Sequence, residues 1–331
     1  MIHHIPHTSI DRSPYDACIA RAANGMPYAF SWYLDAMAGK WDALVWGDYE
    51  AVCPLPWNAK WLGLKQVYLP LFCQQLGVFA EKAPAPEVVR AFLEAIPAAF
   101  RKVLICLNEK NEVDELPGWE VYQKPNYLLG LNRPWEAIES GYSKSLKKRL
   151  RKAREEHTLV ADPLLPENLS RLYQQQVGEK VECPPRIYRR FERVMQEAIA
   201  RGLGRIWCAA DAGGELLAAG FFLQSHGRLI NVFGASTARG KERHSMHFLL
   251  DALIRRHAGQ PWVLDFEGSS IPSIAYFFGS FGAEEVSYPC ILKDGMPGVL
   301  RRLKGTSAIT PKSPDNSPGV PSQRKRWSMP L

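Results

Sequence analysis

The second half of the sequence alternates between helical and strand-like patterns in a definite order. Residues 166–178 and 186–201 carry apolar side chains at helical spacing. Three strand-like runs follow within residues 205–236. The segments between them, Ala-Gly-Gly-Glu and His-Gly, are typical of tight turns, so we predict an antiparallel meander. The pattern continues as helix, strand, helix and strand to residue 292. We therefore predict the order α-α-β-β-β-α-β-α-β.

The first half carries a weaker copy of this order. The predicted elements are short helices at 15–23 and 31–38, paired strands at 41–48 and 49–57, a longer apolar segment at 67–79, a helix at 86–100, and strands at 102–108 and 119–131. Two similar halves suggest an internal duplication, although the sequence itself shows no repeat. A length of 331 residues also fits about two domains.

A basic segment lies between the halves and predicts a connecting helix. Its apolar residues are spaced four, four, four and three apart and would form one stripe: Ile138, Tyr142, Leu146, Leu150 and Ala153. We therefore expect an α/β (α+β) fold of two domains, each with a mixed, mostly antiparallel sheet flanked by helices. The expected boundaries are 1–135, 136–158 for the basic helix, 159–304, and 305–331 for a disordered tail rich in Pro, Ser and basic residues.

The formal net charge of +7 is concentrated in two short segments. Residues 141–157 carry a net charge of +5 and residues 301–331 one of +6, which leaves −4 on the remainder. In the connecting helix, the residues that would contact a nucleic acid are Lys147, Lys148, Arg151 and Lys152. The alternative is an ordinary solvated helix face docked by its apolar stripe.

The seven cysteines are scattered, mostly within apolar runs, and never spaced as CxxC. We expect buried, reduced thiols and a cytoplasmic protein. The sequence predicts neither a signal peptide nor a membrane span, because it has no N-terminal apolar region and no run of 18 apolar residues. The first residues include His3, His4 and His7, which we expect to be exposed in an unanchored terminus. We predict no metal site.

A basic segment that contains glycine leads into the N-terminus of the predicted helix at 245–257. Such a place suits an anion, because the first turn of a helix has backbone N–H groups without partners. The residues that would form the anion site are Arg239, Lys241, Arg243, His244 and Ser245, with Ser245 as the N-cap. The alternative is an ordinary charged loop. Motifs for a serine hydrolase (G-x-S-x-G) or a P-loop do not occur in the sequence.

The order α-α-β-β-β-α-β-α-β resembles the GNAT N-acyltransferase fold. Two such halves joined by a basic helix resemble the Fem-type transferases, which add amino acids to peptidoglycan precursors from aminoacyl-tRNA. The resemblance covers roughly residues 25–295 and implies two tandem GNAT-like domains. The segments that carry it are PLPWNAKWLGLKQVYLPLFCQQLGVF (54–79), SKSLKKRLRKA (143–153), DFEGS (265–269) and FFGSFGAEE (277–285).

The sequence departs from acetyl-CoA-binding members of the superfamily in one motif. These members usually show Q/R-x-x-G-x-G/A before the helix, whereas residues 239–245 read RGKERHS and lack the second Gly-rich part. The resemblance therefore implies a donor substrate that is either acyl-CoA or aminoacyl-tRNA, with no tightly bound cofactor. The paired-helix insertion of some Fem proteins also has no counterpart here.

The reaction implied by the resemblance is attack of an amine on an activated acyl carbon. Such a site needs donors for an oxyanion and a group that takes the amine proton. By position, the strand through Asn231, Phe233 and Gly234 would meet the donor. Glu267 or Ser269 could orient or deprotonate the amine, and Tyr288 could protonate the leaving group. The alternative is that these are ordinary half-exposed strand and core-edge residues.

The acceptor would be an amine-bearing peptidoglycan precursor or small molecule bound between the halves. Candidate contacts are Gln74 and Gln75 in the first half and Lys180 and Glu182 in the second, and structural hydrogen bonding is the alternative for the two glutamines. A rival interpretation is a non-catalytic scaffold that binds nucleic acid through the basic helix, and tRNA is a possible partner in either case. The sequence leaves the oligomeric state open.

Overall fold

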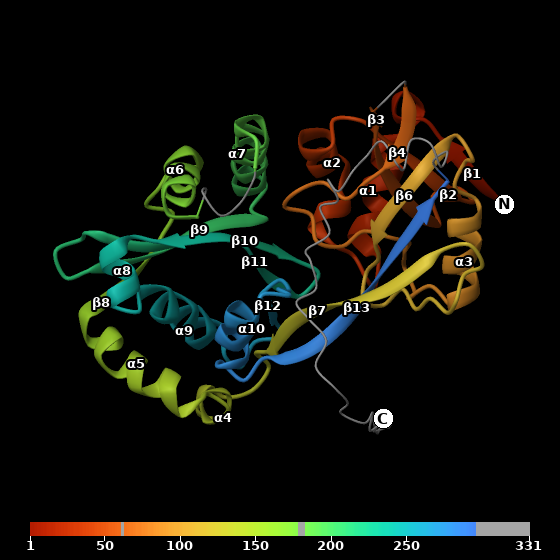
Figure 1. Cartoon of the computed structure of the whole chain (residues 1–331). Helices are drawn as coiled ribbons and strands as arrows, with labels where there is room; N and C mark the ends of the chain where they lie inside the picture. The colour runs from red at the N-terminus through yellow and green to blue at the C-terminus, as the bar shows by residue number, and fades with distance from the viewer. Residues whose placement is uncertain (61–62, 178–182, 296–331) are drawn as a thin grey trace. The chain divides into compact units, whose positions relative to one another are not determined.

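The computed structural model describes residues 1–60, 63–177 and 183–295 (Figure 1). The first half begins with a mainly helical part and continues with strands around one helix. Its elements are β1 (Ile2–Ile5), a 3-10 turn (His7–Ser9), α1 (Arg12–Arg21), a 3-10 turn (Pro27–Ala29), α2 (Ser31–Met37), β2 (Trp41–Trp46), β3 (Ala51–Lys60), β4 (Leu64–Val67), β5 (Phe79–Ala80), α3 (Pro86–Glu94), β6 (Phe100–Cys106) and β7 (Glu120–Gly130).

The second half begins with the basic connecting region and follows the predicted order. Its elements are α4 (Trp135–Ser140), α5 (Lys144–Glu156), β8 (His157–Ala161), α6 (Pro166–Val177), α7 (Pro185–Ala200), β9 (Gly204–Asp211), β10 (Leu216–Ser225), β11 (Arg228–Ser236), α8 (Ala238–Glu242), α9 (Ser245–His257), β12 (Val263–Asp265), α10 (Pro272–Gly279) and β13 (Glu284–Asp294). The order α-α-β-β-β-α-β-α-β is confirmed, with α8 as an addition before α9.

Three predictions for individual elements need correction. The helix expected at 86–100 ends at Glu94, and Phe100 already begins β6. The single basic helix expected at 136–158 is instead two helices, α4 and α5, and His157 already begins β8. The segment before α9 is not an open loop, because Thr237 caps the short helix α8 by accepting a hydrogen bond from the Gly240 N–H.

The strands of both halves join in one sheet. Its order is β1-β2-β3-β4-β6-β13-β7-β12-β11-β10-β9-β8, and β5 pairs with β3. The last strand, β13, lies between β6 and β7 of the first half, and β7 in turn pairs with β12 of the second half. Residues 1–295 consequently form one compact unit. The expected boundaries near residues 135 and 158 stay a prediction, and the tail at 305–331 lies outside the described residues.

Helices cover both faces of the part of the sheet that β9, β10 and β11 form (Figure 1). The helices α6 and α7 contact β11 and β9 on one face, and α9 packs on the other, where it also contacts α5. All five apolar residues of the predicted stripe are buried in the core beneath α9, but they are divided between α4, the residues after it and α5. Full burial of each large aliphatic side chain contributes about 1.5–3 kcal/mol before conformational entropy is counted.

The alternation of side chains along β7 separates two environments. Tyr127 and Leu129 pack in the core beneath α9, so Lys124 and Asn126 point to the opposite face of the sheet. In the neighbouring β12, Leu264 belongs to the same core as Leu129. Asp265 therefore shares the face of Lys124 and Asn126, and this face carries the candidate site.

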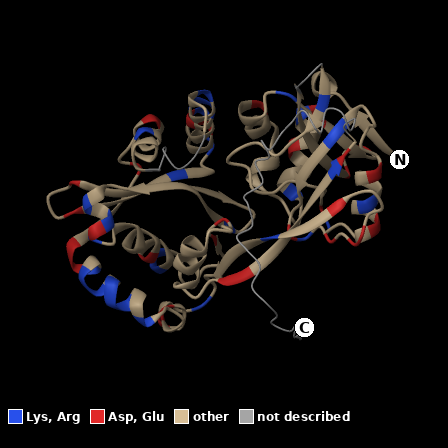
Figure 2. Cartoon of the chain, in the orientation of Figure 1, with Lys and Arg blue, Asp and Glu red and all other residues tan. Residues whose placement is uncertain are grey.

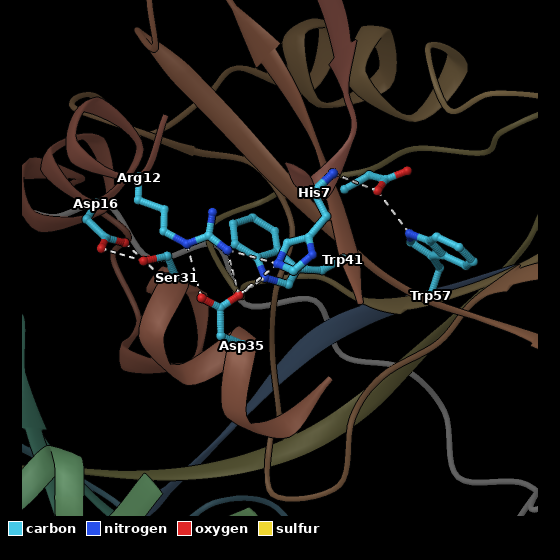
Figure 3. A network of polar contacts seen from close by, with 8 residues as sticks. His7, Arg12, Asp16, Ser31, Asp35, Trp41 and Trp57 are labelled. Carbon is cyan, nitrogen blue, oxygen red and sulfur yellow. Dashed lines mark hydrogen bonds and ion pairs between the residues drawn. The ribbon is translucent and has the colours of Figure 1, made fainter. Parts of the chain in front are cut away.

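The N-terminal histidines are anchored, which corrects the expectation of an unanchored terminus. The Nε2 atom of His4 lies 2.9 Å from Asp42, and that of His7 lies 2.9 Å from Asp35. Figure 3 shows that Arg12 and Trp41 converge on the same Asp35 carboxylate. These contacts tie the first residues to α2 and β2, since Asp35 lies on α2 and Asp42 on β2.

The expectation that all cysteines are reduced is wrong for one pair. Cys106 on β6 and Cys290 on β13 are directly opposite each other in the sheet and form a disulfide across 184 residues of sequence. The other five, Cys18, Cys53, Cys73, Cys183 and Cys208, are free thiols, and all of them except Cys183 are buried as expected. The disulfide links the C-terminal strand covalently to the first half.

Candidate functional site

Glu267 lies in a sharp turn directly after β12. Its φ of 53° is in the left-handed region, which is rare for a residue with a Cβ and is often found at functional sites. Its backbone N–H donates a hydrogen bond of 2.9 Å to Oδ1 of Asp265. The next residue, Gly268, passes so close to β7 that a Cβ there would overlap the carbonyl oxygen of Pro125. The segment DFEG therefore sets the position of the Glu267 carboxyl group.

A buried charge cluster holds Asp265 in place. Nη1 of Arg228 donates to Oδ2 of Asp265 over 2.8 Å, and Nη2 forms an ion pair with Glu109. Asp265 is fully buried, and the side chains of Arg228 and Glu109 are nearly so. Breaking such a pair typically costs 3–5 kcal/mol, because the remaining charge stays buried.

The Glu267 carboxyl group is shielded from water by the surrounding protein. Burial raises its pKa to about 8, the Tyr28 hydroxyl donates a hydrogen bond that opposes this rise, and the charge of Asp265 adds to it. A carboxyl group with this pKa exchanges its proton near neutral pH, which suits a general base or acid. The predicted residue Glu267 therefore has the chemistry expected of a proton acceptor.

Phenol and thiol groups from both halves surround Glu267. Burial raises the pKa values of these groups above their ordinary range, and the nearby Glu267 charge raises them further. The groups are Tyr28, Tyr33, Cys73, Tyr173 and Tyr288. The sequence prediction included Tyr288 but missed the four others. The segment PYAFSWYL resembles an ordinary apolar helix, and only the need of a buried tyrosine hydroxyl for a partner could have drawn attention to it.

The strand β11 leaves part of one edge unpaired beside this cluster. Its parallel pairing with β12 covers only residues 228–230, and beyond Ile230 only β10 pairs with it in the described part of the chain. A bulge at Val232 separates the pairs of Asn231 and Phe233 with β10. Phe233 is buried, and its ring stacks on Tyr173 with centroids 4.0 Å apart. The unpaired edge therefore begins next to the strand that ends at Asp265.

At Gly234, the backbone of β11 lies close to β10 and to α9. A Cβ at this position would lie 3.2 Å from both the carbonyl oxygen of Ala219 and the Met246 side chain. Both contacts are tighter than usual, so a larger side chain would displace its neighbours. The contact explains why this position in β11 is occupied by glycine.

The basic residues before α9 are mostly paired. Arg239 on α8 forms ion pairs with Asp211 and Glu215, and Lys241 donates a hydrogen bond of 2.8 Å to Gln176. Arg243 is the C-cap residue of α8. Their role in donor binding stays a prediction.

The start of α9 also differs from the expected cap. His244, with a φ of 57°, is the N-cap residue, and the helix begins at Ser245. The Ser245 hydroxyl is instead buried and lies 2.8 Å from Nε2 of His157, whose Nδ1 donates to the Ala153 carbonyl. The expected N-cap role of Ser245 is therefore wrong, because its side chain belongs to a buried structural hydrogen bond.

The other predicted site residues have different surroundings. The Ser269 hydroxyl accepts a hydrogen bond of 3.1 Å from the Ile271 N–H and so shapes the start of α10. Gln75 is fully buried, and its Nε2 donates to Oε1 of Gln74 over 2.8 Å. Lys180 and Glu182 lie outside the described residues. The structure thus brings Gln74, Glu267 and Tyr288 to one region of the sheet and leaves Ser269 in a local turn.

The basic face of α5 points away from the core. Figure 2 shows Lys and Arg gathered along this helix. The predicted residues Lys147, Lys148, Arg151 and Lys152 are all exposed. Arg154 is different, because it pairs with Glu139 and with the buried Asp251 and thereby fixes α5 against α4 and α9.

Residues 140–266 match the family model of the acetyltransferase (GNAT) domain. This segment is similar to a GNAT domain. It contains α5 to β12, so its end lies one residue before Glu267. The GNAT fold supports acyl transfer in general, with a donor of the acyl-CoA type.

Solved structures share the fold over most of the chain. FemX has a TM-score of 0.63 at 11% identity, over 91% of this chain and 99% of that one. The C-terminal domain of an Agrobacterium fabrum protein named as a lysylphosphatidylglycerol synthetase has a TM-score of 0.52 at 12% identity, over 86% and 92%. A conserved protein of unknown function from Bacteroides thetaiotaomicron has a TM-score of 0.52 at 11% identity, over 85% of this chain and 92% of that one. At these identities the likeness shows the fold alone.

No curated protein matches the sequence. In the described part of the chain, none of the helices combines the length and the apolar character that crossing a bilayer requires.

Proposed function

We propose that the protein is an N-acyl or aminoacyl transferase that moves an activated acyl group onto an amine acceptor. The observation that carries this proposal is the carboxyl group of Glu267, with a pKa of about 8, at the end of the β12 strand of a GNAT-like domain. The unpaired edge of β11 begins beside it. A proton acceptor next to an edge that offers backbone N–H groups fits attack of an amine on an acyl carbon.

Each group has a stated role in the proposed reaction. The amine forms a bond to the acyl carbon, and the bond from this carbon to the leaving sulfur or oxygen breaks. Glu267 takes the proton that the attacking amine loses, and Tyr288 gives a proton to the leaving group. Backbone N–H groups of residues 231–236 stabilise the oxyanion. The Tyr28 hydrogen bond favours the charged form of Glu267 and so keeps it available as a base.

The donor is either an acyl-CoA or an aminoacyl-tRNA. The GNAT-like domain supports the first class, and the exposed cations of α5 support the second. We propose donor binding along residues 231–246 and an acceptor that is a peptidoglycan precursor or a small amine. Both choices rest on the resemblance of the sequence to Fem-type transferases and on the position of Glu267 between the two halves.

The test incubates the purified full chain with a panel of acyl-CoAs and charged tRNAs together with amine acceptors. We expect transfer with at least one donor, measured as a labelled acyl group on the amine. A donor that raises the melting temperature without transfer would locate the failure in the acceptor panel. If no donor produces a thermal shift and no donor supports transfer, the proposal is wrong.

A non-catalytic scaffold that binds nucleic acid is a second candidate. The observation that favours it is the row of exposed Lys and Arg residues on α5 (Figure 2). Contacts to several phosphates make binding fall steeply with salt, with a log–log slope of about −0.9 for each duplex phosphate neutralised. Salt-insensitive binding of RNA and DNA, or none, would reject this candidate.

A further inference from the structure

A row of hydrogen-bonded amides ends on a buried donor beside the candidate site. The Glu109 N–H donates to Oε1 of Gln75 over 3.1 Å, Nε2 of Gln75 donates to Oε1 of Gln74 over 2.8 Å, and Nε2 of Gln74 donates to Oδ1 of Asn126 over 3.3 Å. Nδ2 of Asn126 is buried and has no hydrogen-bond partner among the described residues. Every amide in the row thus points its donor end toward Asn126.

The orientation of the Asn126 amide is fixed by its neighbours. Its Oδ1 also accepts a hydrogen bond of 2.9 Å from the Tyr127 N–H, which can only donate. A rotated amide would set its NH2 group against this N–H and against the Gln74 donor. A buried donor without a partner costs about 1–3 kcal/mol, and aligned hydrogen bonds polarise one another. Asn126 therefore offers a strengthened donor to an incoming oxygen, most favourably one with negative charge.

A cation lies two residues away on the same face of β7. Lys124 is half-buried and forms no ion pair with an acidic residue in the described part of the chain. Its Nζ lies 5.9 Å from the centroid of the Tyr122 ring, and burial lowers its pKa. Lys124 is opposite Tyr288 in the pairing of β7 with β13, and such cross-strand pairs share one face.

Lys124 and Asn126 lie beside Glu267, on the side away from β11. A Cβ on Gly268 would lie 3.0 Å from Cα of Asn126, so the turn that carries Glu267 rests directly on this residue. The strand order β11-β12-β7-β13 places β11 on one side of β12, and Lys124 and Asn126 on the other. An acyl donor along β11 would leave the β7 side to the second substrate.

We propose that Lys124 and Asn126 bind a carboxylate of the acceptor, so that the acceptor is an amino acid or peptide whose own carboxylate positions its amine toward Glu267. This inference rests on the proposed function and names the substrate class of the same site. Lys124 supplies the charge, and the end of the amide row supplies the directed hydrogen bond. An amine without a carboxylate would leave the Asn126 donor unpaired.

The test measures binding to the full chain by isothermal titration calorimetry with matched ligand pairs. The pairs are L-lysine and L-lysinamide, L-alanine and L-alaninamide, and alanylalanine and its C-terminal amide, so each pair keeps the amine and changes only the carboxylate. In at least one pair we expect the ligand with the free carboxylate to bind at least about 10-fold more tightly than its amide. Lys124→Met should abolish this preference, and Lys124→Arg should retain much of it.

Lys293→Met is the matched control, because Lys293 is an exposed lysine on the neighbouring β13. It should leave the preference unchanged. Equal binding of acid and amide in every pair, or a preference that survives Lys124→Met, would overturn the inference. The wild type separates the two proposals. If it transfers no acyl group from any donor but keeps the acid preference, only the transferase proposal fails, since ligand binding needs no turnover. Glu267→Gln should lose transfer and keep the acid preference.

Discussion

At the scale of single residues, Glu267 owes its chemistry to neighbours that are distant in sequence. Tyr28 belongs to the first half of the chain, whereas Asp265 precedes Glu267 by two residues. The sequence motif DFEGS was sufficient to select Glu267 as a candidate, because a carboxylate after an apolar strand is recognisable, and its catalytic role stays a prediction. It was insufficient to predict Tyr28, since a tyrosine in an apolar helical segment is usually a core residue.

Replacement of Tyr28 by Phe should raise the pKa of Glu267 above its value of about 8. The Tyr28 hydroxyl donates to the charged form of the carboxyl group, so its loss disfavours that form. A ¹³C NMR titration of the Glu267 carboxyl group measures the change. Tyr33→Phe is the control, because its hydroxyl donates to the Phe72 carbonyl and not to Glu267. An unchanged pKa in Tyr28→Phe would show that the hydrogen bond has no influence.

At the scale of elements, periodicity was a good guide to helices and strands with an apolar face. The stripes of α5 and α7 were predicted because their apolar residues repeat at helical spacing. The short α8 was missed, since ARGKE has no apolar periodicity and only the Thr237 cap marks its start. The turn between β12 and α10 was recognised as chemically important, but its left-handed residue and close approach to β7 depend on packing.

Gly268→Ala should destabilise this turn, because the new methyl group would overlap the Pro125 carbonyl. Forcing such an atom into a packed site typically costs about 1–3 kcal/mol. The free energy of unfolding in urea measures the loss. Gly279→Ala at the end of α10 is the matched control, since a Cβ there meets nothing within 4 Å. Equal stability of the two variants would contradict the close approach.

At the scale of the whole molecule, the crossed order of β13 and β7 was not predicted. Local patterns identify both strands, but their partners are chosen by contacts between residues far apart in sequence, such as Cys106 and Cys290, which are 184 positions apart. The same crossing brings Tyr288 and Lys124 together on one face. The scattered spacing of the cysteines gave no indication of this pair, because a single disulfide has no spacing rule.

Reduction of the Cys106–Cys290 disulfide should lower the free energy of unfolding by about 2–5 kcal/mol, because the cross-link restricts the unfolded chain over a long loop. Urea denaturation with and without dithiothreitol measures the difference. The double variant Cys106→Ala and Cys290→Ala should show no response to dithiothreitol. A wild-type midpoint that is the same under both conditions would contradict a disulfide in the folded protein.

The proposed role of Glu267 as proton acceptor is tested by the rate of acyl transfer in Glu267→Gln, measured with the donor that the wild type uses. General base catalysis typically contributes about 100- to 10,000-fold, so we predict a fall of at least about 100-fold in kcat. Donor binding, measured by calorimetry, should be unchanged, since the donor is proposed to bind along β11. Turnover equal to that of the wild type would contradict the assignment of Glu267 as the proton acceptor.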